Sequence, residues 1–150
     1  MDLGDRSAII DLTHAYCWAL DTHRWDELRD VFLPEARAVL GGSDLHGIDD
    51  IIARVRRALS PLDDSQHMVS THQIRLDGDR ATCRCYLHAQ HVRLAAEGGP
   101  SYVVAGRYED QLVRTPQGWR IARRDLITMW TQGNPNVVRP QTPPEASAGE

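Results

Sequence analysis

Two polar residues, Asp21 and His67, suggest the chemistry of this chain. Asp21 follows the apolar residues 18–20 at the end of an amphipathic segment, and His67 follows the polar residues 63–65 at the start of an extended one. A carboxylate beside an imidazole orients the ring and raises its basicity, which gives a general base that works near neutral pH. Taken singly, Asp21 could instead cap the next helix, and His67 could be a solvated strand end.

His91 is a third candidate. Along an extended segment over residues 81–94, strict alternation places His91 on the same face as Cys83, Cys85, Leu87 and Ala89. It is the lone polar group in an apolar row that should face the interior, either as a hydrogen-bonded core histidine or as part of a site. The opposite face should be exposed or form a sheet-to-sheet dimer contact, and it carries Arg84, Tyr86, His88 and Gln90.

Three helical segments precede the strands. Apolar residues recur at spacings of three and four over residues 7–20, again over 25–32, and again over Ile48–Leu59. Pro34 should end the second helix, because its ring cannot continue the helical hydrogen-bond ladder. A brief strand is predicted over 37–40 and a turn over 41–44. The first helix should end near Asp21.

Four long strands should follow. The extended segments cover residues 67–76, 81–94, 102–114 and 119–130, and short turns join them. This order predicts an α+β fold in which a curved, cone-shaped antiparallel sheet has three N-terminal helices packed over its concave face. Polar side chains that point into the cone would be the functional ones. Residues 1–132 should form this domain, and the proline-rich residues 133–150 an extended or disordered tail.

The composition agrees with one domain. A chain of 150 residues with 41% hydrophobic residues can build one core. Its net charge of −4 lacks the basic field that nucleic acid or an anionic membrane would need. We find no signal peptide and no run of about 18 apolar residues, so a soluble cytoplasmic protein is expected. No metal or organic cofactor is expected, and the three cysteines should be reduced and buried.

Several short motifs occur in a distinctive order: YCWALD (16–21), RWDEL (24–28), GIDDI (47–51), QH (66–67), LDGDRA (76–81), GRYED (106–110) and GWRI (118–121). Over residues 5–132 this order resembles the SnoaL-like branch of the nuclear transport factor two-like superfamily. The resemblance implies a cystatin-like α+β barrel. It does not define the reaction, because this fold hosts dehydratases, isomerases, cyclases, dehydrochlorinases, hydrolases and non-catalytic modules.

The resemblance implies roles for individual residues. In scytalone dehydratase, bile-acid dehydratase and hexachlorocyclohexane dehydrochlorinase, an aspartate that closes the first helix pairs with a histidine that opens the first long strand. Asp21 and His67 occupy those places, so His67 would take the proton while Asp21 holds and polarises the ring. His91 resembles the second active-site histidine of scytalone dehydratase. Arg124 resembles the pocket arginine of the dehydrochlorinase, although a bulge could exchange it with Arg123.

Some positions depart from these relatives. Leu40 and Val104 stand where ketosteroid isomerase has its two aspartates, and neither can move a proton. Leu20 replaces a tyrosine of scytalone dehydratase, which suggests a different substrate.

The preferred function is a cofactor-independent lyase or isomerase that abstracts a proton from a hydrophobic, polycyclic or aromatic substrate and eliminates or moves a neighbouring group. Tyr16, His91 or Arg124 would stabilise the oxyanion or protonate the leaving hydroxyl. The remaining predicted substrate-binding residues are the apolar wall residues Trp18, Met68 and Trp130. The alternatives are a polyketide cyclase with Asp21 as the acid, or a non-catalytic ligand-binding or dimerisation module. A homodimer through the outer sheet face is expected.

Overall fold

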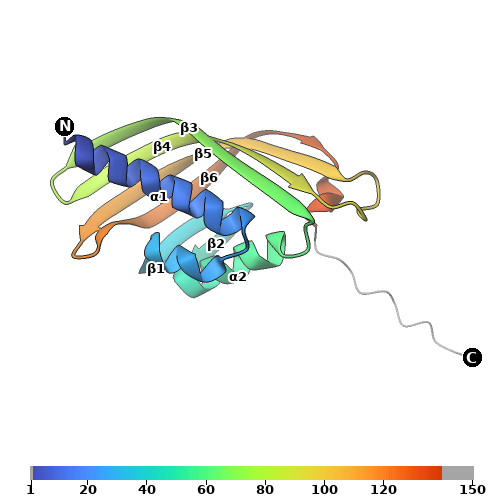
Figure 1. The fold of residues 1–150 in the computed structure, drawn as a ribbon, viewed down its shortest axis with the longest axis horizontal. Helices are drawn as coiled ribbons and strands as arrows, with labels where there is room; N and C mark the ends of the chain where they lie inside the picture. The colour runs from blue at the N-terminus through green and yellow to red at the C-terminus, as the bar shows by residue number, and fades with distance from the viewer. Residues whose placement is uncertain (1, 140–150) are drawn as a thin grey trace, which may run out of the picture.

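Three helical segments and a short hairpin precede four long strands (Figure 1). The computed structural model describes residues 2–139. The helical elements are α1 (Leu3–Asp21), the 3-10 helix η1 (Trp25–Asp30), α2 (Ile48–Leu59) and the short 3-10 helix η2 (Pro135–Val137). The strands are β1 (Phe32–Leu40), β2 (Ser43–His46), β3 (Asp64–Asp77), β4 (Arg80–Val92), β5 (Ser101–Thr115) and β6 (Gly118–Gly133). The three N-terminal helical segments and the four long strands are therefore confirmed.

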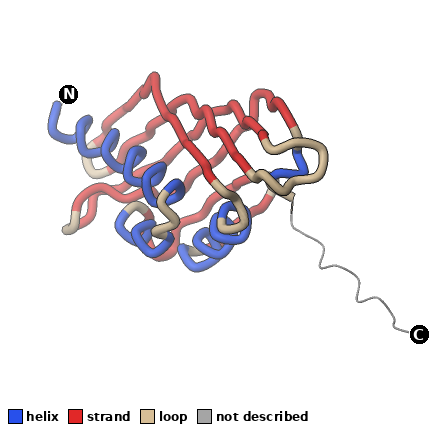
Figure 2. Tube along the Cα trace, turned by 45° about the vertical axis from the view of Figure 1, so that its right-hand side comes forward, coloured by secondary structure: helices blue, strands red, loops and turns tan. Residues whose placement is uncertain are grey.

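All six strands form one sheet in the order β2-β1-β6-β5-β4-β3. Strands β3 to β6 make the predicted antiparallel meander. β1 pairs in parallel with β6, so the sheet is mixed. The sequence analysis missed this pair, because it joins strands that are far apart along the chain. Figure 2 shows the helices on one side of the curved sheet, as predicted.

The core lies between α1 and the concave face of the sheet. α1 contributes buried Ile9, Tyr16 and Leu20 and packs chiefly on β3. On β4, the five residues from Cys83 to His91 at alternate positions are buried, and those between them are exposed or half-buried. This confirms the predicted alternation. The cysteines are free and buried, also as predicted.

The segment after η1 differs locally from the prediction. The second helix ends at Asp30, and Pro34 lies within β1. The predicted turn over 41–44 is shorter, because Ser43 already pairs with Leu40 across the β1–β2 hairpin. Gly41 and Gly42 alone make this turn, with φ values of 55° and 81°. Glycine adopts such positive φ angles without steric cost, so two residues are enough to reverse the chain.

The domain continues beyond the predicted boundary at residue 132. Gly133 ends β6, and the side chain of Asn134 caps η2 while its amide donates to the carbonyl oxygens of Glu97 and Gly99. Val137 is 1% exposed. Residues 133–139 are therefore packed on the domain, and the rest of the predicted tail lies outside the described residues. Among residues 2–139, no helix combines the length and apolar character needed to cross a membrane.

Candidate active site

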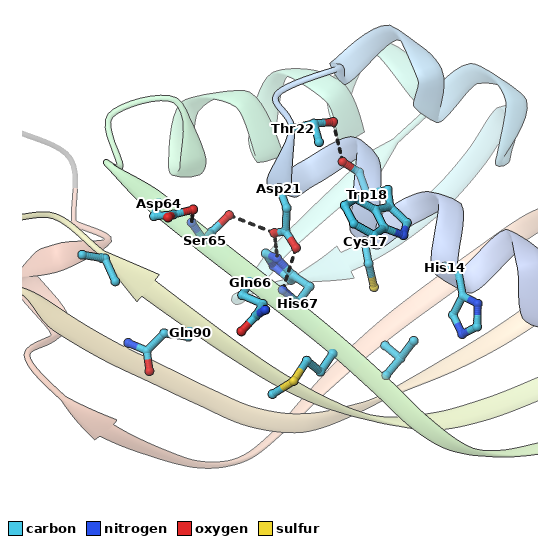
Figure 3. A pocket seen from close by; sticks show the side chains of 13 residues that line it. His14, Cys17, Trp18, Asp21, Thr22, Asp64, Ser65, Gln66, His67 and Gln90 are labelled. Atoms are coloured by element: carbon cyan, nitrogen blue, oxygen red, sulfur yellow. Dashed lines mark hydrogen bonds and ion pairs between the residues drawn. The ribbon is translucent and has the colours of Figure 1, made fainter.

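Asp21 and His67 lie in direct contact where the end of α1 meets the start of β3 (Figure 3). Nδ1 of His67 lies 2.6 Å from Oδ1 of Asp21, and the backbone N–H of His67 donates to Oδ2 at 2.8 Å. The Ser65 hydroxyl also donates to Oδ1, at 2.9 Å. One carboxylate thus fixes both the ring and the backbone of the histidine. The alternative role of Asp21 as a helix cap is not seen, because Arg24 is the N-cap residue of η1.

These contacts define the tautomer of His67. A carboxylate only accepts hydrogen bonds, so Nδ1 of His67 carries the proton and Nε2 carries the lone pair. Nε2 makes no hydrogen bond with any residue between 2 and 139. The His67 side chain is 6% exposed and that of Asp21 is 18% exposed. When Nε2 accepts a proton, the adjacent carboxylate stabilises the resulting imidazolium, so the pair can act as a general base.

His67 and His91 share the wall of an interior pocket of about 330 Å³. This interior pocket lies inside the cone and is bounded by α1, α2 and the concave face of the sheet. Most of its lining is apolar, with leucines, valines and alanines from all of these elements. A pocket with this lining suits a small hydrophobic ligand whose orientation depends on a few polar groups.

His91 is 6% exposed, and its ring meets that of His67 at a centroid distance of 5.7 Å and an angle of 85°. Its Nδ1 lies 3.2 Å from the carbonyl oxygen of Tyr102. Burial, followed by the nearby His67, lowers the pKa of His91 to about 4. The ring is therefore neutral at pH 7, with Nδ1–H donating to the carbonyl group. Nε2 can accept a hydrogen bond, but His91 has no proton to give to a leaving group.

Tyr16 also lines the interior pocket and is 2% exposed. Burial raises the pKa of its hydroxyl, so Tyr16 keeps its proton and can donate a hydrogen bond. Its predicted place beside the pocket agrees with the structure.

Arg124 does not line the interior pocket. It is fully buried between the rings of Tyr16 and Tyr108, at 4.4 and 3.9 Å from their centroids, and donates to both oxygens of Asp110 at 2.8 Å. Its guanidinium group packs against the two tyrosine rings in the core and does not line the pocket, so the predicted substrate contact is not observed. Arg123 does not line the interior pocket either, because it is 38% exposed and pairs with Asp125.

Three predicted apolar wall residues do not line the interior pocket. Trp18 and Met68 are 69% and 51% exposed and line an outer groove of about 550 Å³ along α1 and β3, and Asp21 and His67 line this groove as well. Figure 3 shows Trp18 together with the Asp–His pair. Trp18 lies two residues after Tyr16 on α1, so the two side chains point in directions about 200° apart around the helix axis and cannot share a face. Met68 follows His67 on a strand and points to the opposite face.

Trp130 is 49% exposed and packs edge-on against the ring of His88, with centroids 5.9 Å apart, on the outer face of the sheet. The cause is a bulge, since Ala105 pairs with Trp130 whereas the next residue, Gly106, pairs with Thr128. The extra residue reverses the alternation of β6 beyond this point.

Polar residues of the interior pocket that the sequence analysis missed include Tyr102, Thr128, Thr131 and Arg54. A signal for Arg54 existed, because it borders the apolar stripe of α2 that contains Ile51, Val55 and Leu59. Thr128 follows the alternation of Arg124 and Leu126, whereas Thr131 reaches the pocket only because of the bulge. Among residues 2–139, no cluster of three or more histidine, cysteine or acidic side chains could hold a metal ion.

The fold and the Asp–His pair together define a class of small α+β domains with a pocket inside a cone. A model of the SnoaL-like domain matches residues 1–125, and the chain belongs to this family. An uncharacterized protein of Mycobacterium tuberculosis is 33% identical over 127 residues, which cover 82% of this chain and 84% of that protein.

Solved structures show the same fold. One from Novosphingobium aromaticivorans, assigned as an aromatic ring hydroxylase, has a TM-score of 0.82 and 26% identity, and the alignment covers 93% of this chain and 99% of that one. Another from the same organism, assigned as a scytalone dehydratase, has a TM-score of 0.80 and 23% identity and covers 95% of both chains. A Salmonella enterica protein of the nuclear transport factor two-like superfamily has a TM-score of 0.71 and 17% identity, and the alignment covers 79% of this chain and 86% of that one. The family model confirms the predicted SnoaL-like family, and the solved structures confirm the fold.

Proposed function

We propose that the protein is a cofactor-independent, lyase-type enzyme in which His67, oriented by Asp21, abstracts a proton from a hydrophobic substrate in the interior pocket. The hydrogen bond of 2.6 Å between His67 Nδ1 and Asp21 Oδ1 carries this proposal, because it leaves Nε2 as the basic atom. The neighbour assigned as a scytalone dehydratase supports elimination, and the neighbour assigned as an aromatic ring hydroxylase supports an aromatic substrate.

The proposed reaction is a dehydration. Nε2 of His67 takes a proton from a carbon next to a carbonyl group, and the Tyr16 hydroxyl donates to the developing oxyanion. The electron pair then forms a carbon–carbon double bond and expels the hydroxyl group on the next carbon. His67 returns its proton to this hydroxyl group, so the products are the unsaturated ketone and water. Nε2 of His91 accepts a hydrogen bond from the hydroxyl group and orients it.

The position of Asp21 favours this reaction over the cyclase alternative. Asp21 does not line the interior pocket, and its carboxylate already accepts hydrogen bonds from Ser65 and from the backbone and ring of His67. It can therefore act through His67, whereas a general acid must contact the substrate itself. A non-catalytic binding module needs no such pair, so a test of proton abstraction separates the enzyme from that alternative.

The test measures proton abstraction without knowledge of the natural substrate. The protein is incubated in deuterium oxide with 2-tetralone, a bicyclic ketone with acidic protons, and exchange is followed by proton NMR. We expect exchange above the buffer rate, and His67→Gln and Asp21→Asn should each reduce it by about a hundredfold or more. The matched control is His88→Gln, which changes an exposed histidine on the outer face.

Retained exchange in a folded His67→Gln variant would exclude His67 as the base. Circular dichroism and thermal unfolding show whether each variant keeps its fold. Absence of exchange in the wild-type protein would favour the non-catalytic module.

A further inference from the structure

Arg54 is a cation in the interior pocket that the proposed reaction does not use. It projects from α2 and lines the same cavity as His67 and His91. Its Nε donates to Ser43 Oγ at 3.2 Å. No carboxylate within residues 2–139 forms an ion pair with Arg54, and its terminal nitrogens make no hydrogen bond in that range. Arg124, which is fully buried, has by contrast both oxygens of Asp110 as acceptors.

The β1–β2 turn leaves space for this guanidinium group. A Cβ atom at Gly41 would lie only 2.6 Å from Nη2 of Arg54, so a side chain there would displace it. Gly41 also lines the pocket, and the Ser43 hydroxyl fixes Nε from the same hairpin. The hairpin therefore positions Arg54 through one hydrogen bond and leaves the remaining N–H groups available to a ligand.

Arg54 and the histidines occupy opposite walls. α2 packs against β1 and β2, at one edge of the sheet, whereas His67 and His91 belong to β3 and β4, at the other edge. Only the curvature of the sheet brings these residues to one cavity. A ligand that spans the pocket would place one end at Arg54 and the other at the base.

An unpaired cation is unfavourable here. Arg54 is half-buried, and loss of solvation, together with the nearby Arg57, lowers the pKa of its guanidinium group. Arginine stays charged in proteins, so the group cannot avoid this cost by losing its proton. An anionic partner offsets the cost of holding a charge in apolar surroundings.

We propose that Arg54 binds a carboxylate group of the ligand, and that the substrates are aromatic or polycyclic carboxylic acids whose reacting carbon lies at the end away from the carboxylate. The reaction in this statement rests on the proposed function, whereas the binding does not. A carboxylate is favoured over a phosphate, because a planar guanidinium group matches two carboxylate oxygens. The pocket supplies no second arginine or lysine for a doubly charged group.

The test compares two ligands of nearly equal shape, 2-naphthoate and its uncharged analogue 2-naphthamide, by isothermal titration calorimetry at pH 7. The wild-type protein should bind 2-naphthoate at least about tenfold more tightly, which corresponds to about 1.4 kcal/mol. Arg54→Gln should remove this preference by weakening 2-naphthoate alone, and Arg54→Lys should keep part of it. Arg56→Gln, which changes an exposed arginine on the same helix, should leave the preference intact.

Three results would overturn the inference: equal affinity of the wild-type protein for both ligands, an unchanged preference in Arg54→Gln, or no binding of either ligand at millimolar concentration. The proposed function can be refuted independently of the role of Arg54. Because 2-tetralone carries no carboxylate, absence of its exchange would refute proton abstraction and leave a preference for 2-naphthoate standing. Exchange without that preference would refute only the role of Arg54.

Discussion

The assignment of His91 as a neutral acceptor predicts how stability depends on pH. Burial lowers its pKa to about 4 in the folded protein, whereas an exposed histidine has a pKa near 6.5. Between these values the unfolded chain binds a proton that the folded protein does not. The contribution of His91 to stability is therefore fully present above pH 6.5 and is lost as the pH falls toward 4.

The size of the effect follows from the two pKa values. Each pH unit between them corresponds to about 1.4 kcal/mol, which sets an upper limit of about 3 kcal/mol for the loss. Between pH 7 and pH 5, where the folded protein still resists protonation, the free energy of unfolding should fall by about 2 kcal/mol because of His91. Other groups also titrate in this range, so the comparison needs a variant in which only this ring is missing.

His91→Gln is that variant. Urea unfolding is followed by tryptophan fluorescence at pH 7, 6 and 5 for both proteins, and the loss of stability in the wild-type protein should exceed that in the variant by about 2 kcal/mol at pH 5. The direction of this difference between the two proteins matters as much as its size. Parallel pH profiles would mean that His91 is protonated equally in the folded and unfolded chains. His91 could then donate a proton, and the proposed division of roles between the two histidines would be wrong.

Further predictions concern the core and the outer face. Asp110→Asn should lower the free energy of unfolding by about 3–5 kcal/mol, because it leaves the buried Arg124 without its counterion, and urea unfolding measures the loss. Asp49→Asn breaks only the exposed pair with Arg29 and should cost less than about 1 kcal/mol in the same assay. For the proposed homodimer, Tyr86→Glu should shift the sedimentation coefficient to that of a monomer, because it places a charge in the outer face. An unchanged dimer would exclude this face.

The elements that the sequence predicts well have periodic burial. The alternation on β4 correctly places His91 inside, and the spacing in α2 identifies a helix of the observed length. These features depend on local patterns, which sequence records directly. The pairing of Asp21 with His67 joins residues far apart along the chain, and it could be predicted only from the resemblance to the SnoaL-like family.

The features that the sequence does not predict depend on contacts between distant segments. The parallel pairing of β1 with β6 joins strands that are separated by α2 and three other long strands, and no local pattern records it. One bulge opposite Gly106 reverses the inward and outward positions near the end of β6 and moves Trp130 outside. Arg54 borders the apolar stripe of α2, but its charge suggests solvent exposure, and the assembled pocket shows that it lines the cavity.

Two chemically identical side chains in this pocket acquire different roles from the groups behind them. Nδ1 of His67 donates to a carboxylate, whose charge stabilises the ring once it is protonated. Nδ1 of His91 donates to a neutral carbonyl group, and the nearby His67 further opposes a positive charge there. A proton that enters the pair should therefore reside on His67. In the proposed reaction, Asp21 would therefore determine which histidine is the base, although it does not line the interior pocket.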